Sequence, residues 1–280
     1  MIIHKTSISI TNYLQNLKET GKSIGFVPTM GALHEGHISL INESLNQNDI
    51  TVCSIFINPT QFNNKEDFRL YPISIEKDLQ LLIQAGCSVL FLPDESEIYS
   101  LSYSPVHYPL GRIEQLLEGY YRPGHFQGVS QVVDRLLRII PADNLYLGQK
   151  DYQQCMIIKK LVQIIGKSNE IHICIIPTVR EKSGLALSSR NLRLNENEKT
   201  LALNLYKELT FIKNNLNNTP VKELKKTAVK RLREAGFVVD YVEVANSETL
   251  EPSENTDEHL VALIAATLGK VRLIDNMILN

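Results

Sequence analysis

Short apolar runs alternate with segments of helical periodicity through the first part of the chain. The runs, which are typical of buried strands, lie at residues 24–27, 50–57, 88–92, 145–148 and 171–176. Apolar residues that recur every three or four positions predict helices over residues 9–19, from near 37, and over 74–85, 128–140 and 152–165. Because strands alternate with helices, the pattern predicts an α/β fold with a doubly wound, parallel, Rossmann-like sheet.

This alternation weakens after Pro177. Residues 177–193 are polar and contain Gly184 and three serines, so we expect a domain of residues 1–177 and a second of residues 178–280. The second domain is expected to be smaller and α+β, with helices over 195–216 and 221–235 and strands over 238–244, 260–266 and 271–274. Asn195, with Glu198 three positions later, has the pattern of a capping box.

The connections between these elements give weaker patterns. We expect irregular chain at 64–71, a loop at 94–104, a short strand at 106–108 and a short helix at 110–118.

Composition and charge exclude several classes of protein. The chain has 280 residues, 43% of them hydrophobic and 21% charged, with a net charge of −2, so neither nucleic acid nor a membrane is expected as a partner. No apolar run approaches the length that spans a bilayer, and the N-terminus lacks a signal-peptide pattern, so we expect a cytoplasmic protein. The four cysteines form no Cys-x-x-Cys pair and are expected to be free thiols; no residue cluster has zinc spacing.

A glycine-containing loop follows the first of the predicted sheet strands. His34 and His37 lie three positions apart where the next helix begins, with Gly36 between them and Gly31 before them. The first N–H groups of a helix attract anions, so two histidines at this place predict a phosphate site. The alternative is an ordinary strand-to-helix turn whose histidines are solvated or hold the loop together.

The same stretch resembles two known groups of enzymes. His34-x-Gly36-His37 is similar to the signature of the nucleotidyltransferase superfamily, and the longer string of residues 28–37 resembles the pantoate–β-alanine ligase family. Three further segments resemble that family in the same order, at residues 58–62, 148–154 and 184–191. Thr60 and Leu187 depart from it, because methionine is frequent at both positions.

The resemblance implies a reaction and its participants. The family joins pantoate to β-alanine in two steps: ATP activates the pantoate carboxylate as an acyl adenylate with release of pyrophosphate, and the β-alanine amine then displaces AMP. It further implies Mg²⁺, a homodimer and substrate binding by residues 1–177. Because the polar segment 183–191 is expected to be flexible, we also expect the C-terminal domain to act as a lid that brings Ser188, Ser189 and Arg190 onto the phosphates.

The resemblance also assigns residues. His37, as proton donor to the phosphate chain, together with His34, Lys150 and Arg190, is implied in catalysis, because the reaction needs positive charge and donors around the phosphates. Gln61 and Gln154 are implied in binding pantoate and β-alanine, since neutral amides orient a carboxylate without dispersing its charge. The remaining implied ATP contacts are Met30, Gly31, Ala32, Leu33, Glu35, Gly36, Gly148, Gln149, Asp151, Val179, Leu187, Ser188 and Ser189.

Several roles stay open at this point. Asp151 can cap a helix as well as contact ATP, and Asn58 and Tyr71 are expected as supports of the site. The turn of residues 122–129, which contains His125, either positions a helix or contacts substrate.

Three other functions share part of the pattern. A nucleotidyltransferase that keeps the nucleotide in its product, such as a phosphopantetheine or nicotinamide-mononucleotide adenylyltransferase, does not account for Gln61 and Gln154. The net charge argues against a tRNA synthetase. A nucleotide-sensing module needs neither Lys150 nor Arg190. An amide product formed together with AMP and pyrophosphate distinguishes the ligase from all three.

Overall fold

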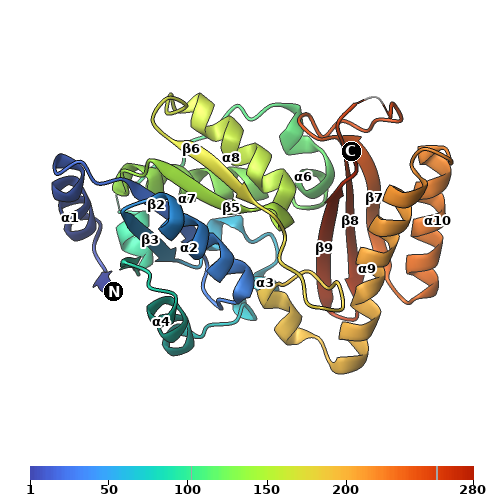
Figure 1. Ribbon diagram of the computed structural model, residues 1–280, viewed down its shortest axis with the longest axis horizontal. Coiled ribbons are helices and arrows are strands. Elements are labelled where there is room, and N and C mark those ends of the chain that lie inside the picture. The colour runs from blue at the N-terminus through green and yellow to red at the C-terminus, as the bar shows by residue number, and fades with distance from the viewer. Residues whose placement is uncertain (102, 257) are drawn as a thin grey trace. The chain divides into compact units, whose positions relative to one another are not determined.

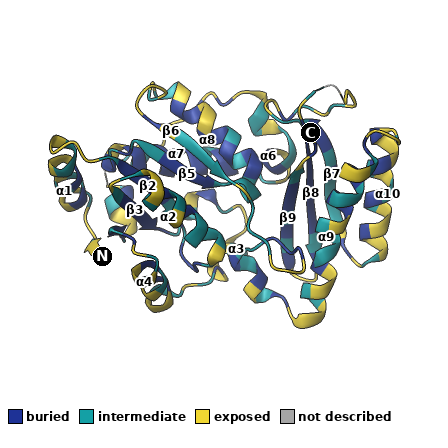
Figure 2. Ribbon diagram, viewed as in Figure 1, coloured by how far each residue is buried: buried dark blue, intermediate teal, exposed yellow. Residues whose placement is uncertain are grey.

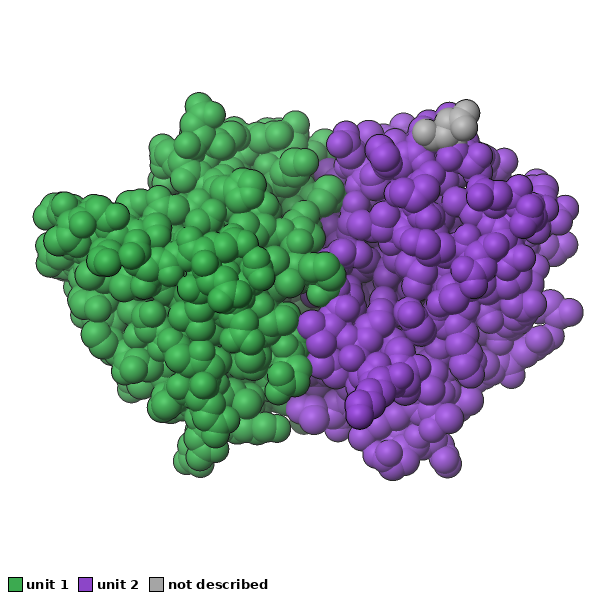
Figure 3. All heavy atoms as spheres, in the orientation of Figure 1, with its two compact units in different colours: residues 1–111, 122–148, 154–177 green, residues 112–121, 149–153, 178–280 purple. Residues whose placement is uncertain are grey.

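The computed structural model describes residues 1–101, 103–256 and 258–280. The chain forms two compact units (Figure 3): unit 1 comprises residues 1–111, 122–148 and 154–177, and unit 2 comprises residues 112–121, 149–153 and 178–280. The long C-terminal stretch of unit 2 begins after Pro177, and two short segments from earlier in the chain belong to the same unit.

Unit 1 is built on a six-stranded parallel sheet with the order β1-β4-β3-β2-β5-β6 (Figure 1). Its strands are β1 (Ile2–His4), β2 (Ile24–Thr29), β3 (Ile50–Ile55), β4 (Val89–Phe91), β5 (Asn144–Gly148) and β6 (His172–Ile176). The chain runs outward from β2 to β3 and β4, and later from β5 to β6, so β2 and β5 are neighbours at which the direction of winding reverses. Ligands of open α/β sheets bind beyond the carboxyl ends of the strands at such a point.

Helices and short helical turns connect the strands of unit 1. They are α1 (Ser7–Glu19), α2 (Glu35–Gln47), η1 (Pro59–Gln61), α3 (Lys65–Arg69), α4 (Ile75–Gln84), α5 (Glu95–Ile98), α7 (His125–Ile139) and most of α8 (Tyr152–Ile164). Ile41 of α2 and Leu82 of α4 pack in one core cluster with Val27, Cys53 and Leu90 of the strands, so these two helices cover the same face of the sheet. Figure 2 shows β2 and β3 as mostly buried, whereas β6 is mostly of intermediate burial.

Unit 2 contains a three-stranded antiparallel sheet with two helices packed on it. Its elements are η2 (Arg112–Gln115), α6 (Leu117–Tyr121), η3 (Gln149–Asp151), η4 (Ser189–Arg193), α9 (Glu196–Asn215), α10 (Val221–Glu234), β7 (Val238–Asn246), β8 (Leu260–Leu268) and β9 (Val271–Ile278). Leu209 of α9 and Leu224 of α10 are fully buried in one cluster with Ile264 of β8. The predicted fold class, a Rossmann-like sheet with a second, smaller α+β part, is confirmed.

A buried ion pair explains why residues 112–121 belong to unit 2. Glu118 of α6 is 6% exposed and accepts two hydrogen bonds of 2.7 Å from the guanidinium of Arg272 on β9. The Tyr241 hydroxyl of β7 donates to the same carboxylate at 2.8 Å. Because a buried carboxylate needs partners for its oxygens, these bonds fix α6 on the small sheet.

Some of the short elements differ from the sequence prediction. The expected strand at 106–108 is wrong, because the side chain of Gln127 bonds both the N–H and the carbonyl of Tyr108, at 3.0 and 2.9 Å, in place of a neighbouring strand. Helix α3 occupies part of the segment expected to be irregular, and its first turn is capped by Asn64, which accepts from the N–H of Glu66 at 2.7 Å. Helix α5 lies within the expected loop, and β1 has no counterpart in the prediction.

Two helices begin earlier in the structure than the sequence predicts. Helix α2 begins at Glu35 and α7 at His125, each two or three residues before the predicted start, because His34 and Gly124 serve as their N-caps. The predicted capping box of α9 is confirmed: Asn195 accepts from the N–H of Glu198, and the Glu198 carboxylate accepts from the N–H of Asn195, both at 2.9 Å.

No helix of the residues that the structure describes is both long and apolar enough to cross a membrane.

The capping box gives a prediction about stability. Asn195→Ala should lower the free energy of unfolding by about 1 kcal/mol, because one N–H at the start of α9 loses its acceptor. Asn195→Asp, which keeps an acceptor at the same place, is the matched control and should stay close to wild type. Urea unfolding of the three proteins measures the effect, and equal stability of the alanine variant would show that the cap contributes nothing.

Candidate active site

His34 and His37 lie at the carboxyl edge of the parallel sheet, where β2 leads into α2. His34 is the N-cap of α2, and its Nδ1 accepts a hydrogen bond from the N–H of Gly36 at 3.1 Å. The N–H of His34 in turn donates to Nδ1 of His37 at 3.3 Å. Two imidazoles therefore form a reciprocal capping box, with ring centroids 4.1 Å apart.

These hydrogen bonds fix which ring nitrogen carries the proton. A nitrogen that accepts from an N–H cannot itself be protonated, so the neutral rings of both His34 and His37 carry their proton on Nε2. A second proton on Nδ1 would displace the capping bond, and two positive rings this close would repel each other. In the neutral pair both Nδ1 atoms therefore act as acceptors for backbone N–H groups.

The loop before the helix uses its own N–H groups internally. The N–H of Gly31 donates to the Thr29 hydroxyl at 3.2 Å, and those of Ala32 and Leu33 donate to the two oxygens of Asp78, both at 2.8 Å. These groups were expected to contact ATP. Because their N–H donors are taken, any contact that Gly31, Ala32 and Leu33 make to ATP has to use other atoms.

Gln61 is held at the end of η1, beyond the carboxyl end of β3. Its side-chain oxygen accepts from Nδ2 of Asn58 at 3.1 Å, and its Nε2 lies 3.0 Å from the sulfur of Met30. Sulfur is a weak acceptor, so the Nε2–H₂ group of Gln61 is the part of this amide best able to donate to a ligand. The contact also brings Gln61 next to Met30, at the start of the histidine loop.

Asn58 holds this turn in place. It is 1% exposed; its Nδ2 donates to the carbonyl of Gly128 at 3.1 Å, and its Oδ1 accepts from the hydroxyls of Thr60 at 3.0 Å and Tyr99 at 2.8 Å. Every polar atom of the Asn58 side chain is thus used within the protein, which makes it a support of Gln61, as expected.

The turn of residues 122–129 also contacts Gln61. The ring of His125 is 5% exposed, and its Nδ1 donates to the backbone carbonyl of Gln61 at 2.8 Å. A Cβ on Gly128 would lie 2.4 Å from the carbonyl oxygen of Thr60, so only glycine lets α7 approach η1 this closely. The turn thus helps to hold the backbone of Gln61 in place.

In unit 2 the structure brings together three of the residues expected to be charged at the site. Lys150 Nζ lies 3.5 Å from Oδ1 of Asp151 in η3. Desolvation alone would raise the pKa of Asp151, but the positive charges of Lys150 and Arg190 outweigh it and hold this pKa below its ordinary value. Two segments about 40 residues apart in the sequence therefore form one charged cluster.

The turn that carries Lys150 is held by the last strand of the chain. Asn276 of β9 is 2% exposed, and its Nδ2 donates to the carbonyls of Gln149 and Lys150 at 2.9 and 2.8 Å. Asp275, the residue before Asn276, accepts two hydrogen bonds from Arg180, at 2.6 and 2.8 Å. Sequence reasoning missed Asn276, Asp275 and Arg180, because nothing in the local pattern links them to Lys150.

The segment before Arg190 forms a small hairpin. The N–H of Leu187 donates to the carbonyl of Val179 at 3.0 Å, and Arg180 pairs with Ala186. Ser188 then caps η4, its hydroxyl accepting from the N–H of Arg190 at 3.3 Å, and Ser189 is 7% exposed. These bonds hold the backbone at Ser188 and Arg190 in one conformation.

A family model described as pantoate-beta-alanine ligase matches residues 2–278. The chain belongs to the pantoate–β-alanine ligase family.

Relatives and solved structures of this family cover the chain almost completely. Pantothenate synthetase of Cytophaga hutchinsonii is 43% identical over 285 residues, which span 97% of this chain and 99% of that protein. A crystal structure of pantothenate synthetase from Thermus thermophilus has a TM-score of 0.91 and 35% identity, covering 100% of this chain and 99% of that one. The crystal structure of pantoate-beta-alanine ligase from Francisella tularensis complexed with beta-gamma ATP and β-alanine has a TM-score of 0.84 and 38% identity, covering 99% and 97%.

Membership in the pantoate–β-alanine ligase family, predicted from four short segments, is confirmed over the whole chain. The expected site residues fall into two groups. In unit 1 are Met30, Gly31, Ala32, Leu33, His34, Glu35, Gly36, His37, Gln61, Gly148 and Gln154; in unit 2 are Gln149, Lys150, Asp151, Val179, Leu187, Ser188, Ser189 and Arg190. Gln154 is half-buried on α8, whereas its neighbour Gln153 is 3% exposed and bonds the N–H of Glu118.

The close approach of α7 to η1 gives a prediction about the site. Gly128→Ala should raise the KM for pantoate at least tenfold, because the new methyl group displaces the backbone that carries Gln61. Ser130→Ala is a control on the same helix, since the Ser130 hydroxyl is buried without a hydrogen-bond partner and should be dispensable. Steady-state kinetics with pantoate varied at saturating ATP measure both variants. An unchanged pantoate KM in Gly128→Ala would remove Gln61 from the pantoate site.

Proposed function

We propose that this chain joins pantoate to β-alanine at the expense of ATP, forming pantothenate, AMP and pyrophosphate through a pantoyl adenylate. The observation that carries the proposal is the pair of imidazoles at the sheet edge, His34 and His37, whose Nδ1 atoms accept backbone N–H groups and whose rings lie together at the N-terminus of α2. Family membership supports the choice of acid and amine.

In the first step a pantoate carboxylate oxygen attacks the α-phosphorus of ATP. A bond forms between that oxygen and phosphorus, and the bond from phosphorus to the bridging oxygen breaks, so the electron pair leaves with pyrophosphate. His34 and His37 donate Nε2–H hydrogen bonds to the phosphate oxygens as charge builds on them. We assign His37 as a neutral donor in place of the proton donor that the family resemblance implies, because its Nδ1 is already occupied.

The acid is oriented by amides in this proposal. Gln61, fixed by Asn58 and His125, donates Nε2–H to an oxygen of pantoate, and Gln154 does so from α8. A neutral amide leaves the negative charge on the carboxylate available for attack, whereas a bidentate ion pair with arginine would disperse that charge and weaken the nucleophile. Residues 1–177 would thus bind ATP and pantoate, and Gln61 would also lie near β-alanine.

In the second step the β-alanine nitrogen attacks the acyl carbon. The carbon–nitrogen bond forms, the bond from that carbon to the AMP oxygen breaks, and the amine proton is lost to solvent. Water has to be excluded from the acyl adenylate until β-alanine attacks, because the mixed anhydride would otherwise be hydrolysed.

Unit 2 supplies the remaining positive charge in this proposal. Lys150 and Arg190 neutralise phosphate oxygens, and Ser188 and Ser189 add neutral donors; Asp151, kept ionised by the two cations, accepts from a ribose hydroxyl. Because residues 149–153 and 178–280 belong to one compact unit, Lys150 and Arg190 would move together if that unit acts as a lid.

The resemblance also implies Mg²⁺. Within residues 1–101, 103–256 and 258–280, no three histidine, cysteine or acidic side chains come together in a way that could hold a metal ion. No step is assigned to the ion, and we propose that Mg²⁺ arrives on the phosphates of ATP. A cytoplasmic homodimer is proposed on the family resemblance.

The adenylate gives the first test of this function. Pantoate-dependent exchange of labelled pyrophosphate into ATP should occur without β-alanine, because the acyl adenylate forms before the amine is needed. With β-alanine added, ¹⁸O from the pantoate carboxylate should appear in AMP. Label in inorganic phosphate, with no exchange, would instead indicate an acyl phosphate and would contradict the proposal.

Substitution of His37 tests the donor. His37→Ala should lower the rate of pyrophosphate exchange by roughly a hundredfold, the usual cost of removing one donor to a developing anion. The exposed His172 on β6 provides the control, and His172→Ala should exchange at the wild-type rate. If His37→Ala exchanged within a factor of three of wild type, His37 would have no part in the mechanism.

A further inference from the structure

Asp78 is a fully buried carboxylate to which the proposed chemistry assigns no role. It lies on α4 and is 0% exposed. Its Oδ1 accepts from the N–H of Leu33 at 2.8 Å and from the Ser74 hydroxyl at 3.0 Å, and its Oδ2 accepts from the N–H of Ala32 at 2.8 Å. A charged group this deeply buried is unfavourable unless hydrogen bonds replace the water that it loses, and these three bonds do so.

The backbone around these bonds has the form of an anion-binding concavity. Gly31 and Ala32 both have positive φ angles, 81° and 50°, which turns successive N–H groups toward one side. Successive N–H groups in such a turn bind phosphate in many nucleotide-binding proteins. Here the anion in the concavity is the protein's own Asp78.

The turn needs this anion to keep its shape. A positive φ is costly for a residue with a Cβ, and Ala32 has one. At Gly31, with φ of 81°, a side chain would be strained as well, and its Cβ would make a tight contact of 3.1 Å with Oδ2 of Asp78. The two hydrogen bonds that Ala32 and Leu33 donate to Asp78 thus hold this turn, which is followed directly by the N-cap His34.

We infer that Asp78 is a positioning residue for catalysis: it fills the concavity of residues 31–33 as an internal anion, and so places His34 and His37. The inference rests on the proposed role of the two histidines. It also gives the loop a function different from that of a phosphate-binding glycine loop, because the concavity is closed to the nucleotide.

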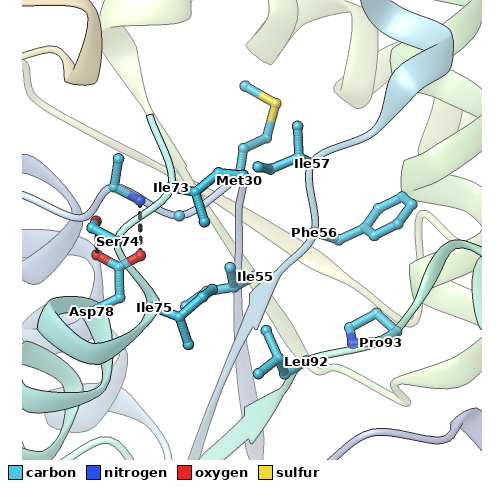
Figure 4. A pocket seen from close by; sticks show the side chains of 12 residues that line it. Met30, Ile55, Phe56, Ile57, Ile73, Ser74, Ile75, Asp78, Leu92 and Pro93 are labelled. Atoms are coloured by element: carbon cyan, nitrogen blue, oxygen red, sulfur yellow. Dashed lines mark hydrogen bonds between the residues drawn. The ribbon is translucent and has the colours of Figure 1, made fainter. Parts of the chain in front are cut away.

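A pocket beside Asp78 makes the inference testable. Figure 4 shows Asp78 at its edge and mostly apolar side chains around the rest. The pocket holds about 180 Å³, enough to admit several water molecules or a small carboxylate. Ile73, one of its lining residues, is 72% exposed, so the pocket can be reached from the surface.

The experiment replaces the internal anion with an external one. Asp78→Ala should lower the rate of pantoate-dependent pyrophosphate exchange by roughly a hundredfold, because the histidines lose their fixed position. Added sodium formate or acetate should restore at least a tenth of the wild-type rate, by occupying the space that the side chain left. Acetamide and sodium chloride, at the same concentrations, should restore none.

Two further variants keep the result interpretable. Asp78→Asn has the same size but turns an amide N–H toward the donors of the loop, so it should lose at least tenfold in rate and should not respond to acetate. Asp134→Asn is the matched control, since Asp134 is a buried acid of unit 1 that bonds Tyr108 and Arg138. It should lower the thermal midpoint and leave the kinetic constants of exchange within twofold.

The possible outcomes separate the inference from the proposed function. No exchange in the wild-type protein would contradict the function itself. Exchange in wild type, with Asp78→Asn within twofold of it, would overturn the inference, as would loss in Asp78→Ala that acetamide or chloride restores as well as acetate does. If Asp78→Ala does not fold, the exchange rates of Asp78→Asn and Asp134→Asn are compared instead. A loss of at least tenfold in Asp78→Asn alone supports the inference, and equal rates overturn it.

Discussion

Backbone N–H groups buried away from water need acceptors, and this requirement determines how the turn between β2 and α2 is built. Thr29, Asp78 and the two imidazoles accept the N–H groups that this turn would otherwise leave without partners. These bonds fix the imidazoles of His34 and His37 at the N-terminus of α2. The site therefore binds phosphate, in this account, through side-chain donors whose orientation is set by the backbone.

Unit 2 meets the corresponding requirement for backbone carbonyl groups, which need hydrogen-bond donors. There, backbone carbonyls at Lys150 need donors, and Asn276 at the far end of the chain supplies them. Arg180 is fixed in turn by Asp275 on the same strand. Each half of the proposed catalytic set is thus held by a buried polar residue from an element distant in sequence, which lets the reacting side chains lie at turns without being loosely held.

Most of the fold could be predicted from the sequence because apolar residues recur with a clear period along the longer helices and strands. Strands β2 to β6 and the long helices were found to within a few residues, whereas β1 and α5 are too short to show one. The histidines and Gln61 were found through motifs. Asp78 carried one local signal, a carboxylate on the apolar face of α4 between Ile75 and Leu82; Asn276 carried none, because its role depends on a contact 126 residues away in the chain.

The central claim is that His34 and His37 act as neutral Nε2–H donors. Long-range ¹H–¹⁵N NMR of the labelled imidazoles, recorded without ligand and with ATP, measures this directly because the nitrogen shift separates protonated from unprotonated sites. The account predicts an unprotonated Nδ1 and a protonated Nε2 in both rings, in both states. A proton on Nδ1 of either ring, in the free protein or after ATP binds, would contradict it.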